Sequence, residues 1–151
     1  MKKSILLLLL VGLSSCTGTK EVSAETGKLY EVLTEQSNGG GNIQFYEILS
    51  EPREIRMLMN DELLKDKIDE KDIVKSNFVV LNMGERNSGG YSITVVNAEE
   101  TATSIILTVK ESTPPTDAMV TQNITYPYTV VKINSKKEIS IKSRPFSALR
   151  K

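Results

Sequence analysis

Few side chains of this sequence can carry out covalent or metal chemistry. Cys16 is its single cysteine, and the sequence contains no histidine and no tryptophan. A Ser-His-Asp or Cys-His nucleophile therefore cannot be assembled within the chain. A zinc site of histidine and cysteine ligands is excluded for the same reason, which leaves only oxygen ligands for a hard cation. We accordingly expect no catalytic residues, no metal site and no cofactor, and we do not expect the chain to be an enzyme.

The surroundings of Cys16 indicate a different chemistry, the attachment of lipid. Lys2 and Lys3 precede an apolar stretch that runs from residue 5 to residue 13. This stretch is too short to cross a bilayer, which takes ~20 apolar residues, so it is typical of an export signal. The ending Leu13-Ser14-Ser15-Cys16 resembles a lipobox, at which lipoprotein processing cuts just before a lipid-modified cysteine. The alternative is a buried free cysteine in a plain secreted protein.

We therefore predict a bacterial-type lipoprotein with a signal peptide over residues 1–15 and a lipid on Cys16. The resemblance implies more than one acyl chain, such as palmitate, and hence a firm membrane anchor, because a single chain binds a membrane only marginally. Residues 16–27 are small and polar, which is typical of a flexible tether. Thr17–Lys20 contain no acidic cluster. This favours a cell-envelope location facing the periplasm, on the inner or the outer membrane.

The charge balance excludes one class of partner. The chain has 19 basic and 19 acidic residues, and loss of the leader makes it slightly acidic. A protein that binds nucleic acid needs a clear basic excess, so we expect no nucleic-acid partner. Residues 143–151 form a basic tail. We interpret this tail as a solvated terminus, and contact with an anionic membrane surface is the alternative.

The first half of the predicted domain combines two strands with a helix. Alternating apolar residues predict strands at Leu29–Thr34 and Ile43–Leu49, and the glycine-rich turn Ser37–Asn42 predicts that they form a hairpin. Ser50 is then expected to cap a helix that has Pro52 in its first turn.

The predicted helix has one apolar stripe. It consists of Ile55, Leu58, Met59 and Leu63, at helical spacing. We interpret the stripe as core packing, with a partner-binding face as the alternative. The segment Lys65–Lys75 is highly charged and alternates in sign, so we expect a solvated helix end and loop.

The second half is rich in predicted strands. They are Phe78–Met83, Gly90–Val96, Thr103–Lys110, Tyr126–Ile133 and Glu138–Lys142. Phe78–Met83 is almost continuously apolar, which is typical of a strand buried on both faces. The regular spacing of the strands favours antiparallel packing over βαβ units. The fold class is therefore mainly β (α+β): an antiparallel sandwich or meander of about seven strands with one main helix, over residues 28–142.

Two segments of this half resemble the signatures of the PrcB C-terminal domain family. The first, residues 79–93, has an apolar strand, then Gly84-Glu85, then a turn through Gly89-Gly90 into Tyr91-Ser92-Ile93. The second consists of Pro114-Pro115, Met119-Val120-Thr121-Gln122 and residues 125–133. The resemblance covers about residues 29–141, and it departs from the family where Asn87-Ser88 replace the usual Pro-Thr.

The resemblance carries an expected function. The family is named for a lipoprotein subunit of a surface protease complex. The resemblance therefore implies that this chain is a non-catalytic, membrane-tethered accessory subunit that binds and stabilises a protease or another envelope protein. The alternative is a protease inhibitor of the chagasin-like type, because the turn that leads into Tyr91 loosely resembles a reactive loop of those β-rich inhibitors.

We predict that the two signature segments lie together and form a protein-binding surface. The candidate residues are Asn87, Ser88, Gly89, Gly90, Tyr91, Tyr126, Pro127 and Tyr128. The two glycines permit a tight reversal, and the proline suits the start or edge of a strand. Tyrosine offers a large contact area at low entropic cost. The alternatives are a hairpin that merely needs glycine, and tyrosines packed over the core.

Overall fold

A computed structural model describes residues 28–144 of the chain. The predicted signal peptide, Cys16, the tether and almost all of the basic tail lie outside these residues. Within residues 28–144, no helix is long and apolar enough to span a membrane.

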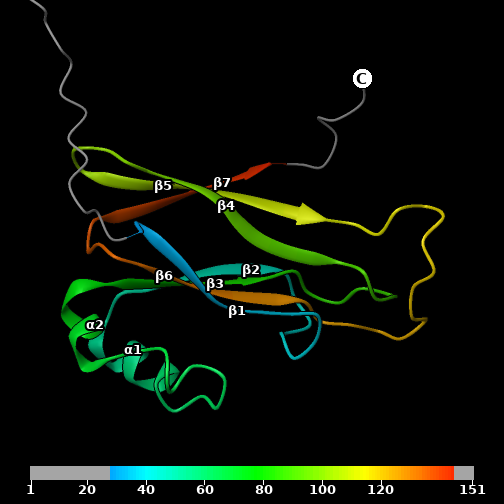
Figure 1. Cartoon of the computed structure of the whole chain (residues 1–151), viewed down its shortest axis with the longest axis horizontal. Coiled ribbons are helices and arrows are strands. Elements are labelled where there is room, and N and C mark those ends of the chain that lie inside the picture. Colours follow the sequence, from blue (N-terminus) through cyan, green and yellow to red (C-terminus); the bar gives the residue numbers. More distant parts are fainter. Residues whose placement is uncertain (1–27, 145–151) are drawn as a thin grey trace, which may run out of the picture.

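The described part folds into two stacked β-sheets with two short helices beneath the first sheet (Figure 1). The first sheet has the order β1-β6-β3-β2, and the second has the order β4-β5-β7. The strands are β1 (Tyr30–Gln36), β2 (Phe45–Leu49), β3 (Asn77–Asn82), β4 (Ser92–Glu100), β5 (Ser104–Ser112), β6 (Tyr128–Ile133) and β7 (Glu138–Arg144). The helices are α1 (Pro52–Leu58) and α2 (Glu70–Lys75). The predicted mainly β class with seven strands is confirmed.

The pairing is antiparallel everywhere except in one place. β5 and β7 are parallel, because the chain crosses from the second sheet to β6 of the first before it returns as β7. The strictly antiparallel arrangement predicted from the sequence therefore holds for the first sheet and for the β4–β5 pair.

The first sheet separates two hydrophobic cores. Between the sheets, β3 contributes Val79 and Leu81, which pack with Ile105, Leu107 and other residues of the second sheet. On the other face, Phe78 packs with residues of the helices and their connection. β3 is thus covered on both sides, and this explains its nearly continuous apolar sequence.

The helical region differs from its prediction. α1 has Glu51, not Ser50, at its N-cap, and the Glu54 carboxylate accepts hydrogen bonds from the backbone N–H groups of both residues. Pro52 lies in the first turn as expected. The helix ends at Leu58, so Leu63 falls beyond it and is exposed.

The charged segment Lys65–Lys75 is also more than a solvated loop. It contains α2, and its Ile68 and Ile73 are buried in the core on the helix side. The sequence pattern missed this because the two isoleucines lie five positions apart, with four charged residues between them, and make no continuous helical stripe.

The predicted hairpin between the first two strands is wrong. β1 and β2 form opposite edges of the first sheet, with β6 and β3 between them. The glycine-rich segment therefore crosses the ends of two strands to reach the far edge. Its small residues allow the chain to pass close to the ends of those strands.

Candidate protein-binding surface

Three loops gather at one end of the sandwich, at the right in Figure 1. They are residues 37–44 between β1 and β2, residues 83–91 between β3 and β4, and residues 113–127 between β5 and β6. We call this region the loop end. It contains both signature segments and the glycine-rich crossing.

Asn82 fixes the first loop to the end of β3. Its buried side chain accepts a hydrogen bond from Gly41 N at 3.0 Å, and donates to the carbonyl oxygens of Gly41 at 2.9 Å and Ile43 at 2.6 Å. Gly40 N donates to the carbonyl of Tyr126 at 2.9 Å. A Cβ on Gly40 would lie 2.1 Å from Asn82 Oδ1, so the close crossing requires glycine there.

The second and third loops are joined by backbone hydrogen bonds. Arg86 and Thr125 form an antiparallel bridge in which each N–H donates to the other's carbonyl, at 2.9 and 2.8 Å. Thr125 Oγ1 donates to the Ser88 carbonyl at 2.8 Å, and Gly89 N donates to the Thr121 carbonyl at 3.0 Å. The turn at residues 87–90 therefore lies against Thr121 and Thr125 of the second signature, as predicted.

Gly90 explains why this turn can pack so closely. Its φ is +87°, and a Cβ there would lie 2.9 Å from Pro114 Cβ. An ordinary L-residue would suffer both backbone strain and a clash with the third loop. The alternative, a turn that merely needs glycine, is thus part of the explanation. The same glycine also allows the second loop to pack closely against Pro114 of the third loop.

The tyrosines of the two signatures divide between different environments. Tyr91 packs against the core between the sheets, whereas Tyr128 packs against the core on the helix side. They do not share one surface. Tyr126 is only partly buried, and its hydroxyl donates to Glu85 Oε2 at 3.2 Å. Partial desolvation and the neighbouring Glu85 carboxylate raise the pKa of the Tyr126 hydroxyl above its ordinary value.

Of the other candidates, Asn87 and Gly90 are exposed, Ser88 and Gly89 are half-buried, and Pro127 is buried. The Pro127 carbonyl accepts a hydrogen bond from Met83 N at 3.0 Å, so this proline extends the pairing between β3 and β6. The accessible part of the predicted surface is therefore smaller than the sequence indicates.

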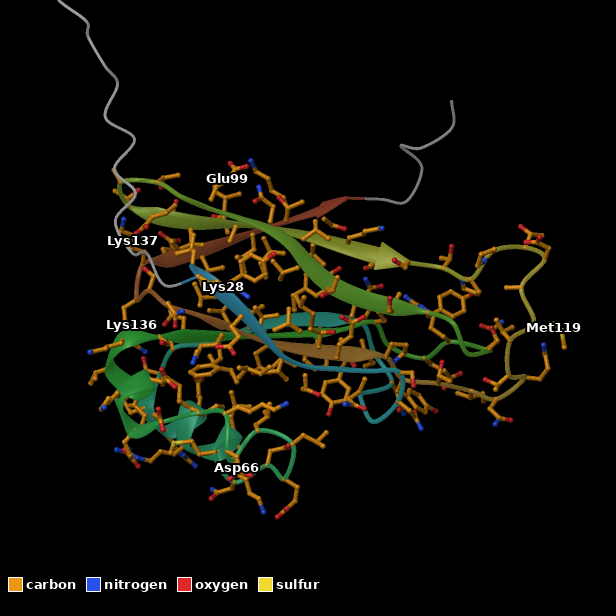
Figure 2. All side chains as sticks on the ribbon, in the orientation of Figure 1. Lys28, Asp66, Glu99, Met119, Lys136 and Lys137 are labelled. Atoms are coloured by element: carbon orange, nitrogen blue, oxygen red, sulfur yellow. The ribbon has the colours of Figure 1, made fainter. Side chains whose placement is uncertain are left out.

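Three exposed apolar residues at the loop end were missed by the sequence analysis as site residues. Met119 is fully exposed at the tip of the third loop (Figure 2), Ile43 is 77% exposed and Ile124 is 55% exposed. Only Ile124 gave a signal in the sequence, because it is an isolated large apolar residue between polar neighbours. Ile43 was predicted to lie in a strand, and Met119 lies between Ala118 and Val120, so neither stood out as a site residue.

Arg86 adds a positive charge to the loop end, opposite Thr125, the residue that follows Ile124. Its guanidinium lies 5.8 Å from the centre of the Tyr91 ring, within cation–π range. The loop end therefore presents a half-buried tyrosine, an arginine held on an aromatic ring and exposed apolar side chains. This composition is typical of surfaces that bind protein.

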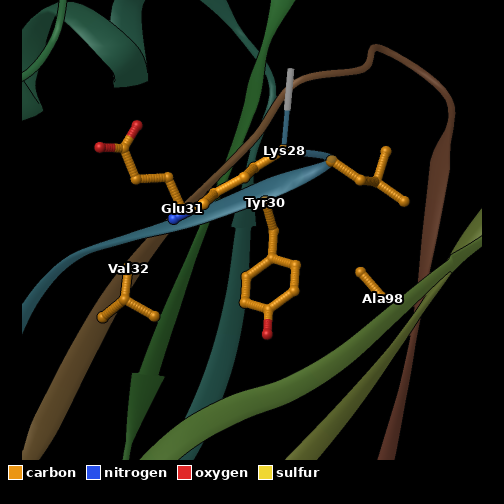
Figure 3. Close-up of a pocket in the computed structure, with 6 residues that line it drawn as sticks. Lys28, Tyr30, Glu31, Val32 and Ala98 are labelled. Carbon is orange, nitrogen blue, oxygen red and sulfur yellow. The ribbon is translucent and has the colours of Figure 1, made fainter. Parts of the chain in front are cut away.

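A second feature lies away from the loop end. An open hollow of about 670 Å³ lies between the edges of the two sheets and is lined by Lys28, Leu29, Tyr30, Glu31, Val32 and Ala98. Figure 3 shows Tyr30 extending from β1 towards Ala98 of β4. Within residues 28–144, no three acidic, histidine or cysteine side chains gather as a potential metal site.

Comparison with known families supports the resemblance. Residues 77–134 match the sequence model of the family described as PrcB C-terminal. The match runs from the start of β3 to just beyond β6 and includes both signature segments, so the family resemblance is confirmed over that part of the chain. No curated protein and no solved structure matches the chain.

Proposed function

We propose that this chain is a non-catalytic, membrane-anchored lipoprotein that binds and stabilises an envelope protease, or another envelope protein complex, through its loop end. One observation carries the proposal: the two signature segments of the matched family meet at this end, through the Arg86–Thr125 bridge. Residues that the family match covers thus form one structural unit on the surface.

The rigidity of the loop end supports a role in binding. The three loops are connected by backbone hydrogen bonds and by the Asn82 side chain. A surface that is ordered before binding loses little conformational entropy when a partner docks. The exposed side chains of Met119 and Ile124 would then be buried by the partner.

The direction of the strands supports presentation away from a membrane. β1 begins beside Asn134, whose N–H donates to the Leu29 carbonyl at 2.9 Å, and then runs to the loop end. Lys28 is thus at the opposite end of the sandwich from the loop end (Figures 1 and 2). An anchor at Cys16, joined through the predicted tether, would leave the loop end pointing outward.

A crosslinked pull-down of the lipidated chain from its own cells tests the proposal. Asn87→Arg introduces a bulky charge at an exposed position of the turn, and Tyr126→Ala removes a partly buried ring without opening the core. Each is expected to reduce recovery of the partner at least about fivefold, which corresponds to ~1 kcal/mol of binding free energy. Tyr128→Ala is unsuitable because Tyr128 packs against a core.

Ala102→Arg is the matched control, because Ala102 is exposed in the turn between β4 and β5 at the other end of the sandwich. Thermal unfolding must show that all variants stay folded. Unchanged recovery with both folded loop-end variants would contradict the proposal. A purified cysteine protease distinguishes the alternative: an inhibitor would slow its hydrolysis of substrate, whereas an accessory subunit would prolong the lifetime of the partner that it captures.

A further inference from the structure

The two sheets expose four strand edges within the described residues. β1 and β2 are the edges of the first sheet, and β4 and β7 are the edges of the second. An edge strand presents unpaired backbone N–H and C=O groups that can pair with another chain. Proteins block such edges with bulges, lysine, proline or inward-pointing charges, so an unblocked edge indicates a place where pairing is used.

Three of the four edges carry such protection. β1 has a bulge between Val32 and Thr34, and β4 has one between Val95 and Asn97. β7 has the exposed Lys142 within the strand, and the turn that precedes it contains Lys136 and Lys137. Each edge is thus irregular or positively charged.

The β2 edge has no bulge, no proline and no lysine, and its single charge is Glu47. Its pairing with β3 is regular from Phe45, opposite Asn82, to Leu49, opposite Phe78. Its large apolar residues are also unusually accessible: Phe45 is 41% exposed and Ile48 is 39% exposed. Ile43, just before the strand, is 77% exposed. The edge is therefore regular in its pairing, and it exposes large apolar side chains on either side of Glu47.

The two sides of β2 differ in chemistry. Phe45 and Glu47 lie on the same side as Leu49, which packs in the core of the helix side. Tyr46 and Ile48 lie on the side that faces the second sheet, and the Tyr46 hydroxyl donates to Glu111 Oε1 of β5 at 2.7 Å. Within residues 28–144, Glu47 forms no ion pair.

We propose that the β2 edge binds an extended segment of a partner protein by strand addition, and that this segment has β-branched residues opposite Phe45 and Ile48 and a lysine or arginine opposite Glu47. Main-chain hydrogen bonds supply the pairing in this mode, and the alternating side chains supply the specificity. A basic residue opposite Glu47 would complete a cross-strand ion pair that the chain itself does not provide.

The charge of Glu47 also argues against a second copy of this chain as the occupant. In antiparallel self-pairing centred on this residue, the two Glu47 carboxylates would lie directly opposite each other, which is destabilising. The proposed edge begins at Ile43, which belongs to the loop end, and continues along the sheet away from it. The proposed strand addition at β2 does not depend on partner binding by the loop end.

Peptides test the proposal on the purified full chain. The probe is a terminally capped peptide Thr-Thr-Val-Lys-Thr-Val-Thr, whose lysine pairs with Glu47 when the peptide lies antiparallel to β2. The matched peptide has glutamate in place of lysine. A third peptide is N-methylated on the alternate backbone amides that would face β2, so that these amides cannot donate hydrogen bonds to the strand. Nuclear magnetic resonance shifts of the backbone amides locate the peptide on the chain, and titration gives its Kd.

The lysine peptide is expected to shift the amides of β2 and to bind about two- to fivefold more tightly than the glutamate peptide. Glu47→Lys should reverse this preference, whereas Glu99→Lys on the β4 edge should leave it unchanged. The methylated peptide should not bind. Shifts at another edge, equal binding of both charged peptides, no binding at millimolar peptide, or self-association of the chain through β2 would each overturn the proposal.

Discussion

At the scale of single residues, the loop end depends on polar groups that satisfy backbone atoms. Asn82 is fully buried at the end of β3 and makes three hydrogen bonds to the backbone of the crossing loop. A buried N–H or carbonyl group without a partner destabilises a fold more than an ordinary hydrogen bond stabilises it. This one amide therefore holds the path of a loop that has no regular secondary structure.

Replacement of Asn82 by alanine is expected to lower the free energy of unfolding by about 2–4 kcal/mol, because it leaves three backbone groups without their partner. Urea unfolding followed by circular dichroism measures the change. The control is Asn97→Ala: the Asn97 side chain is exposed, donates to Glu99 and should be worth less than about 0.5 kcal/mol. Equal losses in the two variants would show that the crossing does not rely on Asn82.

The sequence predicted part of this site. The two signatures identified residues that do lie together, because Gly89, Gly90 and Thr125 are the residues through which the loops touch. It did not predict Asn82, because an asparagine at the end of a strand has the same local pattern whether it is exposed or buried. Its role depends on where the loop at Gly40 crosses, which only the fold decides.

At the scale of elements, the strands were easier to predict than the helices. β3 and β5 have strong apolar patterns because both are covered by packing partners, and their positions agree closely with the prediction. The helices are short and pack on the sheet through scattered residues, such as Ile68 and Ile73. A stripe of helical periodicity needs several consecutive turns, and neither helix provides them.

The revised end of α1 gives a direct test. Leu58 is half-buried and packs against the helix-side core, so Leu58→Asp is expected to lower stability by about 2–3 kcal/mol through loss of packing and desolvation of a carboxylate. Leu63 lies beyond the helix and is 46% exposed, so Leu63→Asp should cost less than about 1 kcal/mol. Thermal and urea unfolding of the two variants provide the comparison. A larger loss for Leu63→Asp would mean that the helix continues as the sequence pattern suggested.

At the scale of the whole molecule, the order of the strands in the sheets could not be predicted from the sequence pattern. Alternation of apolar residues predicts which side of a strand is buried, but it carries no information about which strand lies beside it. The short glycine-rich link between β1 and β2 favoured a hairpin, the most local solution. The structure instead inserts β6 and β3 between them, so that residues distant in sequence complete the first sheet.

This topology determines which end of the sandwich the proposed lipid anchor would hold nearer a membrane. The turn between β4 and β5 lies at the same end of the sandwich as Lys28, and the turn between β6 and β7 connects them. Asn134 of that turn donates to the Lys28 carbonyl at 2.6 Å, and Lys137 donates to the Thr101 carbonyl at 2.8 Å. β5 then leads from this end to the third loop, over roughly 30 Å for its nine residues. A lipid on Cys16 with a tether reaching about 20 Å should keep the Thr103 end nearer the membrane than the Met119 end on average.

Fluorophores attached through Thr103→Cys and Met119→Cys test this orientation, since the native thiol would be blocked by lipid. On vesicles that contain lipid-borne quenchers, the label at position 103 is expected to be quenched more strongly than the label at position 119, because quenching falls steeply with distance from the bilayer. Equal quenching, or the reverse order, would contradict the predicted orientation.

The substitution Cys16→Ser tests the anchor itself, and it is introduced into each of the two labelled variants. It should abolish lipid labelling, release the protein from the membrane fraction and remove the difference in quenching between positions 103 and 119. If the protein stays membrane-bound after Cys16→Ser, the anchor lies elsewhere, and the outward direction of the loop end loses its physical basis.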